Sequence, residues 1–576
     1  EILSGLVGSE MCIRDRPKGV KMEEMFEVYC RNTDTKVLVP SGTDLSGVAR
    51  FAGVRNIETI LGACVNNKVQ NLNYRIYSPK TVEFLDIHTS SGRRMYALSS
   101  MFMLYKTVKE LYPQNELYIQ HSMTDGYFCE IKALSEDLPT ALTKIKKRMQ
   151  EMVEEDIPFA RQIIPVEEAV ELFEKLEMHD KAELIRNSNR LYANIDLLGD
   201  TVNAFFYELV PATSYLKVFD LYAFENGFIL QMPKKDNTLP ARQSDKGDRK
   251  IFSIFREHKN WVRILGTPYV SNLNKAVEMK KQNELIQVSE ALHEKKYSEI
   301  ADSIYQRKDE VKFVLLAGPS SSGKTTSCRR IATQLAVLGF RPLQISLDDY
   351  FIDREHTPRD AEGNYDFECL EALDLDYFNH QMRQLLNGEE IELPRFDFIE
   401  GKRVQSGNKL KMQQGSIVIV EGIHALNPAL SAKIPAKNKY NVFVSALTQL
   451  ALDKHNLISS SDNRLLRRIV RDNNYRGYSA QDTIMRWESV RNGEEKHIFP
   501  YQENADSIFN SSLLYEIGVL KPLAENLLIE VPQNSPAYSE ARRLQNFLAD
   551  FKSIKTDYIP PTSIMREFLG GSSFRY

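Results

Sequence analysis

The sequence predicts a chain of several domains, one of which is an α/β domain with a mainly parallel sheet. Its 576 residues are enough for two to four domains, each able to bury a core. Residues 311–317 form a short apolar run of the kind found in buried parallel strands. A loop rich in serine and glycine follows, and then Ile331, Leu335 and Leu338 recur at helical spacing as far as Gly339. Strand, loop and helix in this order are the unit from which parallel sheets are built.

The loop between this strand and this helix fits the phosphate-binding pattern G-x-x-x-x-G-K-[ST] at every fixed position. Its residues are Gly318, Pro319, Ser320, Ser321, Ser322, Gly323, Lys324, Thr325 and Thr326. Backbone N–H groups of such a loop curve around a triphosphate, and the helix N-terminus adds the positive end of its dipole. Lys324 can then reach the terminal phosphates, and the Thr325 hydroxyl can ligate Mg²⁺. Because both flanks are correct, we prefer a nucleotide site to a merely flexible loop.

Composition bounds the class of protein. A net charge of −4, with 42% hydrophobic and 26% charged residues, is ordinary for a globular protein and gives no reason to expect a nucleic acid or a membrane as partner. The six cysteines are scattered without a C-x-x-C pair, which favours reduced thiols and a cytoplasmic protein. No apolar run approaches the roughly 18 residues that span a bilayer. Composition thus gives no sign of a membrane or nucleic-acid partner, and a homo-oligomer is left open; a small-molecule partner is what the family resemblance described below implies.

The first residues do not resemble protein selected to fold. Residues 1–16, which contain Met11-Cys12-Ile13-Arg14-Asp15-Arg16, resemble translated sequencing-adaptor DNA. A signal peptide is the alternative, but its apolar part would be short and no basic residue precedes it. We expect the native chain to begin nearby, close to Met22.

Short strands and turns follow. Residues 26–29 and 36–39 are two β-type runs separated by Asn32-Thr33-Asp34, which predicts a hairpin. The stretch from Leu61 to Lys68 resembles the TGS domain, a small β-grasp module found in threonyl-tRNA synthetases and some GTPases. This resemblance covers residues 23–88 and implies no catalytic residue.

Residues 89–270 resemble the second additional domain of threonyl-tRNA synthetase, an α+β editing domain. We expect its first helix at residues 96–113 and its central strand at residues 119–130. In the synthetases two histidines on that helix, four residues apart, edit mischarged tRNA. The matching positions here are Leu98 and Phe102, which indicate core packing, so the resemblance implies an editing fold without its chemistry.

Two further features belong to this front half. His121 remains in the central strand, but a lone histidine is more often structural than catalytic. From residue 271 to 308 an apolar stripe that includes Leu285, Ile286 and Leu292 predicts a helical linker to the C-terminal domain.

Carboxylates follow two more predicted strands. Residues 343–347 end in Asp348 and Asp349, and residues 415–420 are followed by Glu421. Carboxyl ends of parallel strands lie beside the phosphate loop, where an acceptor hydroxyl and Mg²⁺ would lie. Each acid alone could be a solvated side chain at a strand end. With the phosphate loop in the same domain, a functional role is favoured.

Arginines recur on one later helix. Arg464, Arg467, Arg468 and Arg471 share a face, and Arg476 follows. Such arginines can close over a transferring phosphoryl group. A basic solvent face, or one that binds RNA phosphates, is the alternative.

At this point a family resemblance can be stated. Residues 348–351, 365–368, 393–398 and 420–423, with the arginine helix, resemble the uridine kinase/phosphoribulokinase family in matching order. The resemblance covers about residues 310–525 and implies a kinase domain at 309–530, followed by a C-terminal extension at 531–576. From residue 23 onward the chain resembles longer bacterial nucleoside kinases with synthetase-like front domains.

The resemblance implies ATP and Mg²⁺ as cofactors and assigns roles by position. Asp348 would be the general base on a ribose 5′-hydroxyl, and Thr325 and Glu421 would hold Mg²⁺. The implied catalytic residues are Lys324, Asp348, Arg468, Arg471 and Arg476, the three arginines as a closing lid. The implied acceptor-binding residues are Asp348, Phe351, Phe367, Glu368, Phe396, Ile423 and Arg468.

The sequence departs from the family at the nucleobase. Uridine kinases have a tyrosine at the position of Phe396 and a base-reading histidine at that of Gly401, and losing these donors weakens discrimination. An ATP-dependent kinase of a uridine- or cytidine-like nucleoside is favoured. The alternatives are a kinase of another small hydroxylated acceptor, such as a sugar phosphate, and a nucleotide-switched regulator bound to RNA or the ribosome. The front domains have no basic run, which argues against the regulator.

Overall fold

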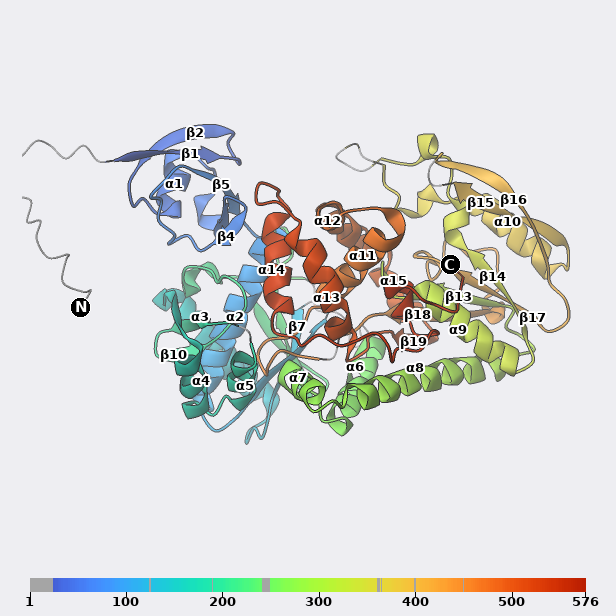
Figure 1. Cartoon of the computed structure of the whole chain (residues 1–576), viewed down its shortest axis with the longest axis horizontal. Helices are drawn as coiled ribbons and strands as arrows, with labels where there is room; N and C mark the ends of the chain where they lie inside the picture. Colours follow the sequence, from blue (N-terminus) through green and yellow to red (C-terminus); the bar gives the residue numbers. More distant parts are fainter. Residues whose placement is uncertain are drawn as a thin grey trace, which may run out of the picture.

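The computed structural model describes residues 24–123, 126–188, 190–240, 249–359, 363, 365–397, 400–448 and 450–575. The segment 1–16, and Met22 as a start, lie outside these described residues. Figure 1 shows a small β-domain at one end of the long axis and the parallel sheet toward the other end, with α13 and α14 between them. None of the helices in the described ranges is both long and apolar enough to cross a membrane.

The first domain is a five-stranded mixed sheet in the order β2-β1-β5-β3-β4. Its elements are β1 (Met25–Cys30), β2 (Thr35–Pro40), α1 (Leu45–Phe51), β3 (Gly62–Val65), β4 (Lys68–Gln70) and β5 (Lys80–Leu85). Strands β1 and β2 form the predicted hairpin, and Asp34 in its turn has a φ of 52°. Strand β5 pairs with β1 in parallel and packs, with α1, around Val28, Val48 and Val82.

The second domain combines two antiparallel sheets, β11-β12-β7-β6 and β10-β9-β8, with a long buried helix. Its helices are α2 (Ser90–Leu111), α3 (Leu138–Glu155), α4 (Val166–Lys175) and α5 (His179–Arg186). Its strands are β6 (Leu117–Met123), β7 (Gly126–Ile131), β8 (Phe159–Pro165), β9 (Tyr192–Leu198), β10 (Thr201–Asn203), β11 (Asp220–Phe224) and β12 (Gly227–Gln231). Phe102 is fully buried in its core and Leu98 packs against the same cluster, as expected of packing residues.

The prediction of one strand over residues 119–130 is wrong. The segment forms two antiparallel strands, β6 and β7, because the alternation of apolar side chains continues on both sides of a reversal. The dipeptide Asp125-Gly126 is a hairpin-turn signal in the sequence. At Gly126 a Cβ would lie 2.1 Å from the Leu230 carbonyl oxygen, so β12 can approach only a glycine there.

His121 belongs to the core. Its ring stacks on Phe255 at 3.8 Å and on Phe128 at 5.2 Å between centroids. Burial, and then the charge of Lys259, lowers the pKa of His121 to about 3, so the imidazole is neutral at physiological pH. This environment suits the structural role that the sequence analysis favoured.

Three helices lead from the second domain to the parallel sheet: α6 (Arg249–Ile264), α7 (Val270–Glu278) and α8 (Gln282–Tyr305). The predicted helical linker, residues 271–308, is helical except at residues 279–281 and 306–308, and α8 is also a layer of the C-terminal core. It runs along α9, with Tyr297 fully buried and its hydroxyl 2.9 Å from the Ser327 hydroxyl (Figure 1).

The C-terminal domain contains the predicted parallel sheet, in the order β14-β17-β13-β18-β19. The strands are β13 (Phe313–Ala317), β14 (Arg341–Ser346), β17 (Ser416–Glu421), β18 (Lys439–Ser445) and β19 (Ser507–Asn510), and β15 (Glu390–Asp397) and β16 (Lys402–Lys411) form a separate hairpin. The helices are α9 (Lys324–Val337), α10 (Leu375–Leu386), α11 (Ser460–Arg476), α12 (Ala480–His497), α13 (Glu516–Ile529), α14 (Tyr538–Leu548) and α15 (Arg566–Leu569). The fold class predicted from the sequence is thus confirmed.

Candidate active site

The phosphate loop connects the end of β13 to the start of α9. At Gly318 a Cβ would lie 2.0 Å from the Val444 carbonyl oxygen, so only glycine fits against β18. Ser321 and Gly323 have φ values of 57° and 84°, which turn the backbone of the loop. The loop therefore leads into the N-terminus of α9, where unpaired N–H groups favour an anion.

Lys324, Thr325 and Glu421 meet at the carboxyl edge of the sheet. Lys324 Nζ donates to the Pro319 carbonyl at 3.1 Å, and the Thr325 hydroxyl donates to Glu421 Oε1 at 2.9 Å. Burial lowers the pKa of Lys324, while Glu421 and Asp348 act in the opposite direction. Burial also raises the pKa of Glu421 to about 7, and the charge of Asp348 adds to this rise.

The two consecutive aspartates have different surroundings. Asp349 is partly buried and accepts the Phe396 backbone N–H at 3.3 Å, and burial raises its pKa. Asp348 is exposed, yet its charge acts on Lys324, Glu421, Glu368 and Arg476. Asp348 is therefore the aspartate whose charge acts on this cluster, while Asp349 lines a cavity together with Thr325 and Glu421.

Phe351, three residues after Asp348, belongs to a cluster of aromatic side chains. The Phe351 ring is 6.3 Å from that of Phe367 and 5.6 Å from that of Phe396, centroid to centroid. Burial, and then the charge of Glu494, raises the pKa of Glu368 to about 7. At Gly493 a Cβ would lie 2.6 Å from the Cβ of Glu368, so α12 passes close to that side chain. Ile423, just after β17, packs against the adjoining apolar cluster.

Three arginines of α11 converge on one buried carboxylate. Asp472 is bonded by Arg468 at 3.2 Å and Arg471 at 2.8 Å, and Arg476 lies 3.6 Å away. Arg468 also donates to the Ser320 hydroxyl of the phosphate loop at 2.8 Å. The sequence predicted these three arginines for one site; in the structure they share one carboxylate, and Arg468 contacts the loop.

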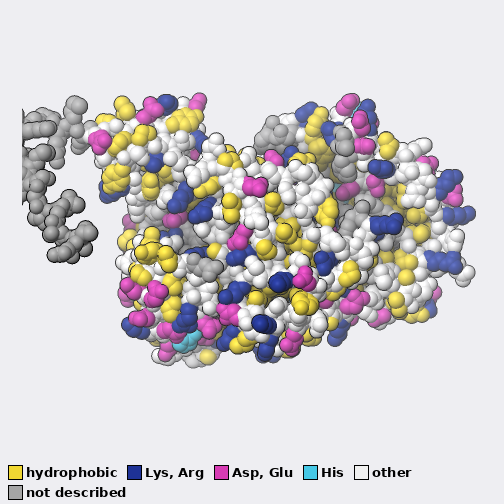
Figure 2. Space-filling model, in the orientation of Figure 1, with side chains coloured by type: hydrophobic (Ala, Val, Ile, Leu, Met, Phe, Trp, Pro, Cys, Tyr) yellow, Lys and Arg dark blue, Asp and Glu magenta, His cyan; other side chains and the backbone are white. Residues whose placement is uncertain are grey.

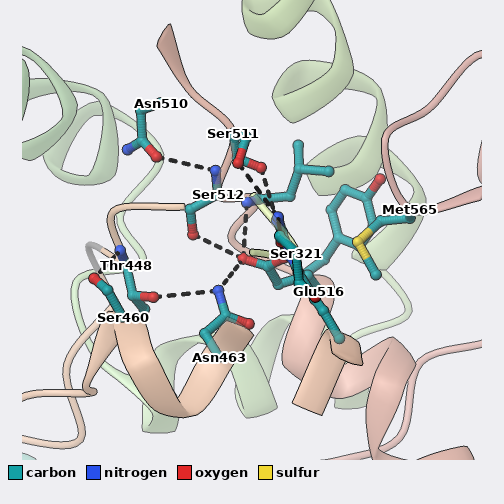
Figure 3. A network of polar contacts seen from close by, with 12 residues as sticks. Ser321, Thr448, Ser460, Asn463, Asn510, Ser511, Ser512, Glu516 and Met565 are labelled. Atoms are coloured by element: carbon teal, nitrogen blue, oxygen red, sulfur yellow. Dashed lines mark hydrogen bonds and ion pairs between the residues drawn. The ribbon is translucent and has the colours of Figure 1, made fainter. Parts of the chain in front are cut away.

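Arg464 and Arg467, which by helical spacing share a face with Arg468 and Arg471, are instead buried in ion pairs. Arg464 is 3% exposed and forms two bonds with Glu494, one of them 2.7 Å long, while Arg467 is fully buried against Glu516. Figure 3 shows the network around Glu516, which accepts from Asn463 at 2.6 Å and from Ser512 at 2.7 Å. The two carboxylates that pair with these arginines, Glu494 of α12 and Glu516 of α13, come from later helices. Helical spacing alone therefore could not distinguish the buried arginines from those at the site.

Two further carboxylates contact the phosphate loop, and no sequence motif identified either of them. The Ser320 N–H donates to Glu494 Oε1 at 2.9 Å. Thr326 donates to Glu567 Oε2, through its hydroxyl at 2.6 Å and through its backbone N–H at 3.3 Å. Glu567 belongs to the C-terminal extension, for which the sequence analysis assigned no role.

Gly401, which stands where uridine kinases have a base-reading histidine, lies against an arginine side chain. Gly401 has a φ of 68°, and a Cβ there would lie 2.8 Å from the guanidinium carbon of Arg354. The Arg354 backbone N–H donates to the Gly401 carbonyl at 2.8 Å. An arginine side chain therefore fills the space next to this glycine. Phe398, part of the predicted motif, lies outside the described residues.

Known proteins are similar to the two halves of the chain separately. Residues 313–514 match the phosphoribulokinase/uridine kinase family. The chain is 30% identical over 204 residues to a uridine kinase of Ligilactobacillus salivarius, covering 35% of this chain and 86% of that one. It is 32% identical over 170 residues to a uridine kinase of Schizosaccharomyces pombe, covering 29% and 33%. Its N-terminal part is 28% identical over 163 residues to a threonine–tRNA ligase of Clostridium kluyveri, covering 28% and 25%, so the chain spans about a quarter of that ligase.

Proposed function

This chain belongs to the phosphoribulokinase/uridine kinase family, and on that premise we propose that it transfers the γ-phosphate of ATP to the 5′-hydroxyl of a nucleoside. One observation carries the proposal. The charge of the exposed Asp348 acts on Lys324 and Glu421, and Phe351, three residues further on, packs in a cluster of aromatic side chains that could contact an acceptor. A base, a phosphate site and a pocket at one sheet edge are what phosphoryl transfer requires.

Each charged residue of the site has a separate role in this reaction. Asp348 accepts the proton of the acceptor hydroxyl, because it is the aspartate that is not engaged by the Phe396 backbone. Lys324 neutralises charge on the terminal phosphates, and Arg468 adds a second cation at the loop. Asp472 positions Arg468 and Arg471, because it bonds both guanidinium groups.

Thr325 and Glu421 fit a magnesium ion. Both present oxygen atoms, which Mg²⁺ prefers, and a site with one carboxylate and one hydroxyl leaves coordination positions for phosphates and water. Bound there, the ion would neutralise charge between the β- and γ-phosphates.

Glu368 and the three phenylalanines would hold the acceptor. A carboxylate can accept two hydroxyl donors of a ribose, and the rings of Phe351, Phe367 and Phe396 offer apolar faces. A sugar phosphate is the second candidate acceptor, because the Arg354 guanidinium beside Gly401 would suit an anionic group.

A phosphate-transfer screen tests the function. ATP labelled at the γ-phosphate would be offered, with Mg²⁺, to nucleosides, sugars and sugar phosphates, using wild type, Asp348→Asn and the exposed neighbour Glu355→Gln as control. We expect one nucleoside to be phosphorylated, and Asp348→Asn to lose about 10²- to 10⁴-fold in kcat while still binding ATP. Equal turnover by Asp348→Asn would refute the base, and ATP binding without any acceptor would favour the regulator.

A further inference from the structure

The C-terminal extension places a carboxylate on donors of the phosphate loop. Glu567, in α15, accepts from the Thr326 hydroxyl at 2.6 Å and from the Thr326 backbone N–H at 3.3 Å. Thr326 lies in the first turn of α9, where backbone N–H groups have no partner within the helix. These are donors that the sequence motif offers to a nucleotide phosphate, so a protein carboxylate here is a competing anion.

A second contact places the same segment directly on the loop. A Cβ at Gly323 would lie 2.8 Å from Ile564 Cδ1, so the Ile564 side chain rests against the backbone of that glycine. Ile564 is fully buried, as are Met565 and Phe568. Apolar packing thus holds the segment on the loop, and the Glu567 contact is not that of an isolated surface side chain.

The segment is also attached to the two helices on either side of the loop. Ser563 donates to Glu290 of α8 at 2.6 Å, and Asn474 of α11 donates to the Phe568 carbonyl at 3.0 Å. Helix α11 carries Arg468, Arg471 and Arg476, and Figure 1 shows α15 beside it. A movement of the segment would therefore be felt by the helix that carries the lid arginines.

Charge explains why this contact competes with a nucleotide. Glu567, with Glu421 and Asp348, is among the carboxylates that favour the charged form of Lys324. Glu567 also adds to the negative charge that acts on Glu421. A bound triphosphate would bring further negative charge to Lys324 and Glu421. Its phosphates and the Glu567 carboxylate would then repel each other.

Glu494 provides a contrast at the other end of the loop. It accepts from the Ser320 N–H, but it is 1% exposed and bonded twice by Arg464, a buried partner that fixes its place. Glu567 is partly exposed and lies on a short helix of four residues. Of these two carboxylates, Glu567 is therefore the one that can leave.

We propose that the Glu567 carboxylate stands in for a nucleotide phosphate at Thr326, and that residues 559–575 form a latch that nucleotide must displace. The inference rests on the proposed function for the identity of the nucleotide, ATP. A site that is open in only a fraction of molecules binds with an affinity reduced by that fraction. The latch would thus set the ATP concentration at which the enzyme becomes active.

ATP binding by the full chain tests the latch. We would titrate ATP into wild type, Glu567→Ala and Asp557→Ala, the last an exposed carboxylate just before the latch segment. We expect Glu567→Ala to bind ATP about tenfold to a hundredfold more tightly, since a charge-assisted contact no longer competes. Asp557→Ala should bind ATP as wild type does.

Two results would overturn the latch, and one would overturn the function instead. Glu567→Ala with unchanged or weaker ATP affinity would show that the carboxylate does not compete. Because this variant could loosen the segment, hydrogen exchange on wild type is a second measurement: ATP should accelerate exchange in residues 559–575, and unchanged or slower exchange would contradict displacement. If neither wild type nor Glu567→Ala binds ATP, the proposed function fails, and the latch fails with it.

Discussion

At the scale of single residues, the site holds carboxylates at high local density. Glu368 and Glu421 both have a pKa raised to about 7, in each case first by burial and then by a neighbouring carboxylate. Glu494 is that neighbour for Glu368, and Asp348 is that neighbour for Glu421. The ionised forms of these carboxylates are unfavourable in the free protein. A bound cation, or hydroxyl groups that donate to them, would stabilise the ionised forms.

The raised pKa of Glu368 predicts a pH-dependent stability. Between its ordinary value near 4.5 and about 7 the folded protein binds a proton that the unfolded chain releases, so stability falls as pH rises through this window. We expect Glu368→Gln to gain about 1 to 2 kcal/mol over wild type on going from pH 5 to pH 8, a reduced figure because the side chain is partly exposed. Urea unfolding at both pH values measures this. The exposed Glu371→Gln is the control, and a gain independent of pH would contradict the assignment.

At the scale of the element, α11 carries arginines of two kinds. Arg464 and Arg467 are buried ion-pair partners of Glu494 and Glu516, and Arg467 also donates to the Ser321 carbonyl of the phosphate loop at 3.3 Å. Arg468 and Arg471 lie on the part of the helix that borders the site, held by Asp472. Helix α11 therefore holds the loop through the buried Arg467 and also places the Arg468 cation against it.

The neighbours Arg467 and Arg468 should respond differently to the same substitution. Arg467→Met leaves Glu516 buried without its cation, so we expect about 3 to 5 kcal/mol loss of unfolding free energy. Arg468→Met should cost less than about 1 kcal/mol, but should lower kcat about 10²- to 10³-fold by removing charge stabilisation. Urea unfolding and steady-state kinetics on both variants measure this. A large stability loss for Arg468→Met, with kcat unchanged, would make it structural too.

At the scale of the whole molecule, the front domains are joined to the kinase domain by buried polar contacts. Lys181 of α5 pairs with Asp453 at 2.9 Å, and both side chains are almost completely buried. The Ile119 N–H of β6 donates to the Lys454 carbonyl at 2.9 Å. Asp453 lies seven residues before Ser460, where α11 begins, so the second domain holds the segment that leads into the arginine helix.

The C-terminal extension adds contacts with both front domains. Asn67 of the first domain donates to the Gln533 carbonyl at 2.9 Å, and Arg94 of the second bonds Glu540 at 3.2 Å. The same extension reaches the phosphate loop through Glu567. On the face of the molecule that Figure 2 shows, acidic and basic side chains are intermixed. This face is not the continuous basic surface that binding to RNA phosphates would favour.

The Lys181–Asp453 pair predicts that the second domain supports the kinase site. Lys181→Met leaves the buried Asp453 carboxylate without its cation, so we expect about 3 to 5 kcal/mol loss of stability, together with a lower kcat because the start of α11 loosens. Thermal unfolding and steady-state kinetics measure the two effects. Lys175→Met, at an exposed lysine of α4, is the control. Full activity in a destabilised Lys181→Met would mean that the domains are joined but not coupled.

The sequence by itself determined the features that depend on local pattern. The phosphate loop, the strands that end in Asp348 and Glu421, the parallel sheet and the loss of the editing histidines all follow from residues close together in the chain. The tertiary structure alone decided which arginines are buried, that Asp349 accepts the Phe396 backbone N–H, and that Glu494 and Glu567 reach the loop. The physical reason is distance along the chain. A helical face is set by spacing, but its role is set by the carboxylates that other elements bring to it, and Glu567 lies 241 residues from the threonine that it contacts.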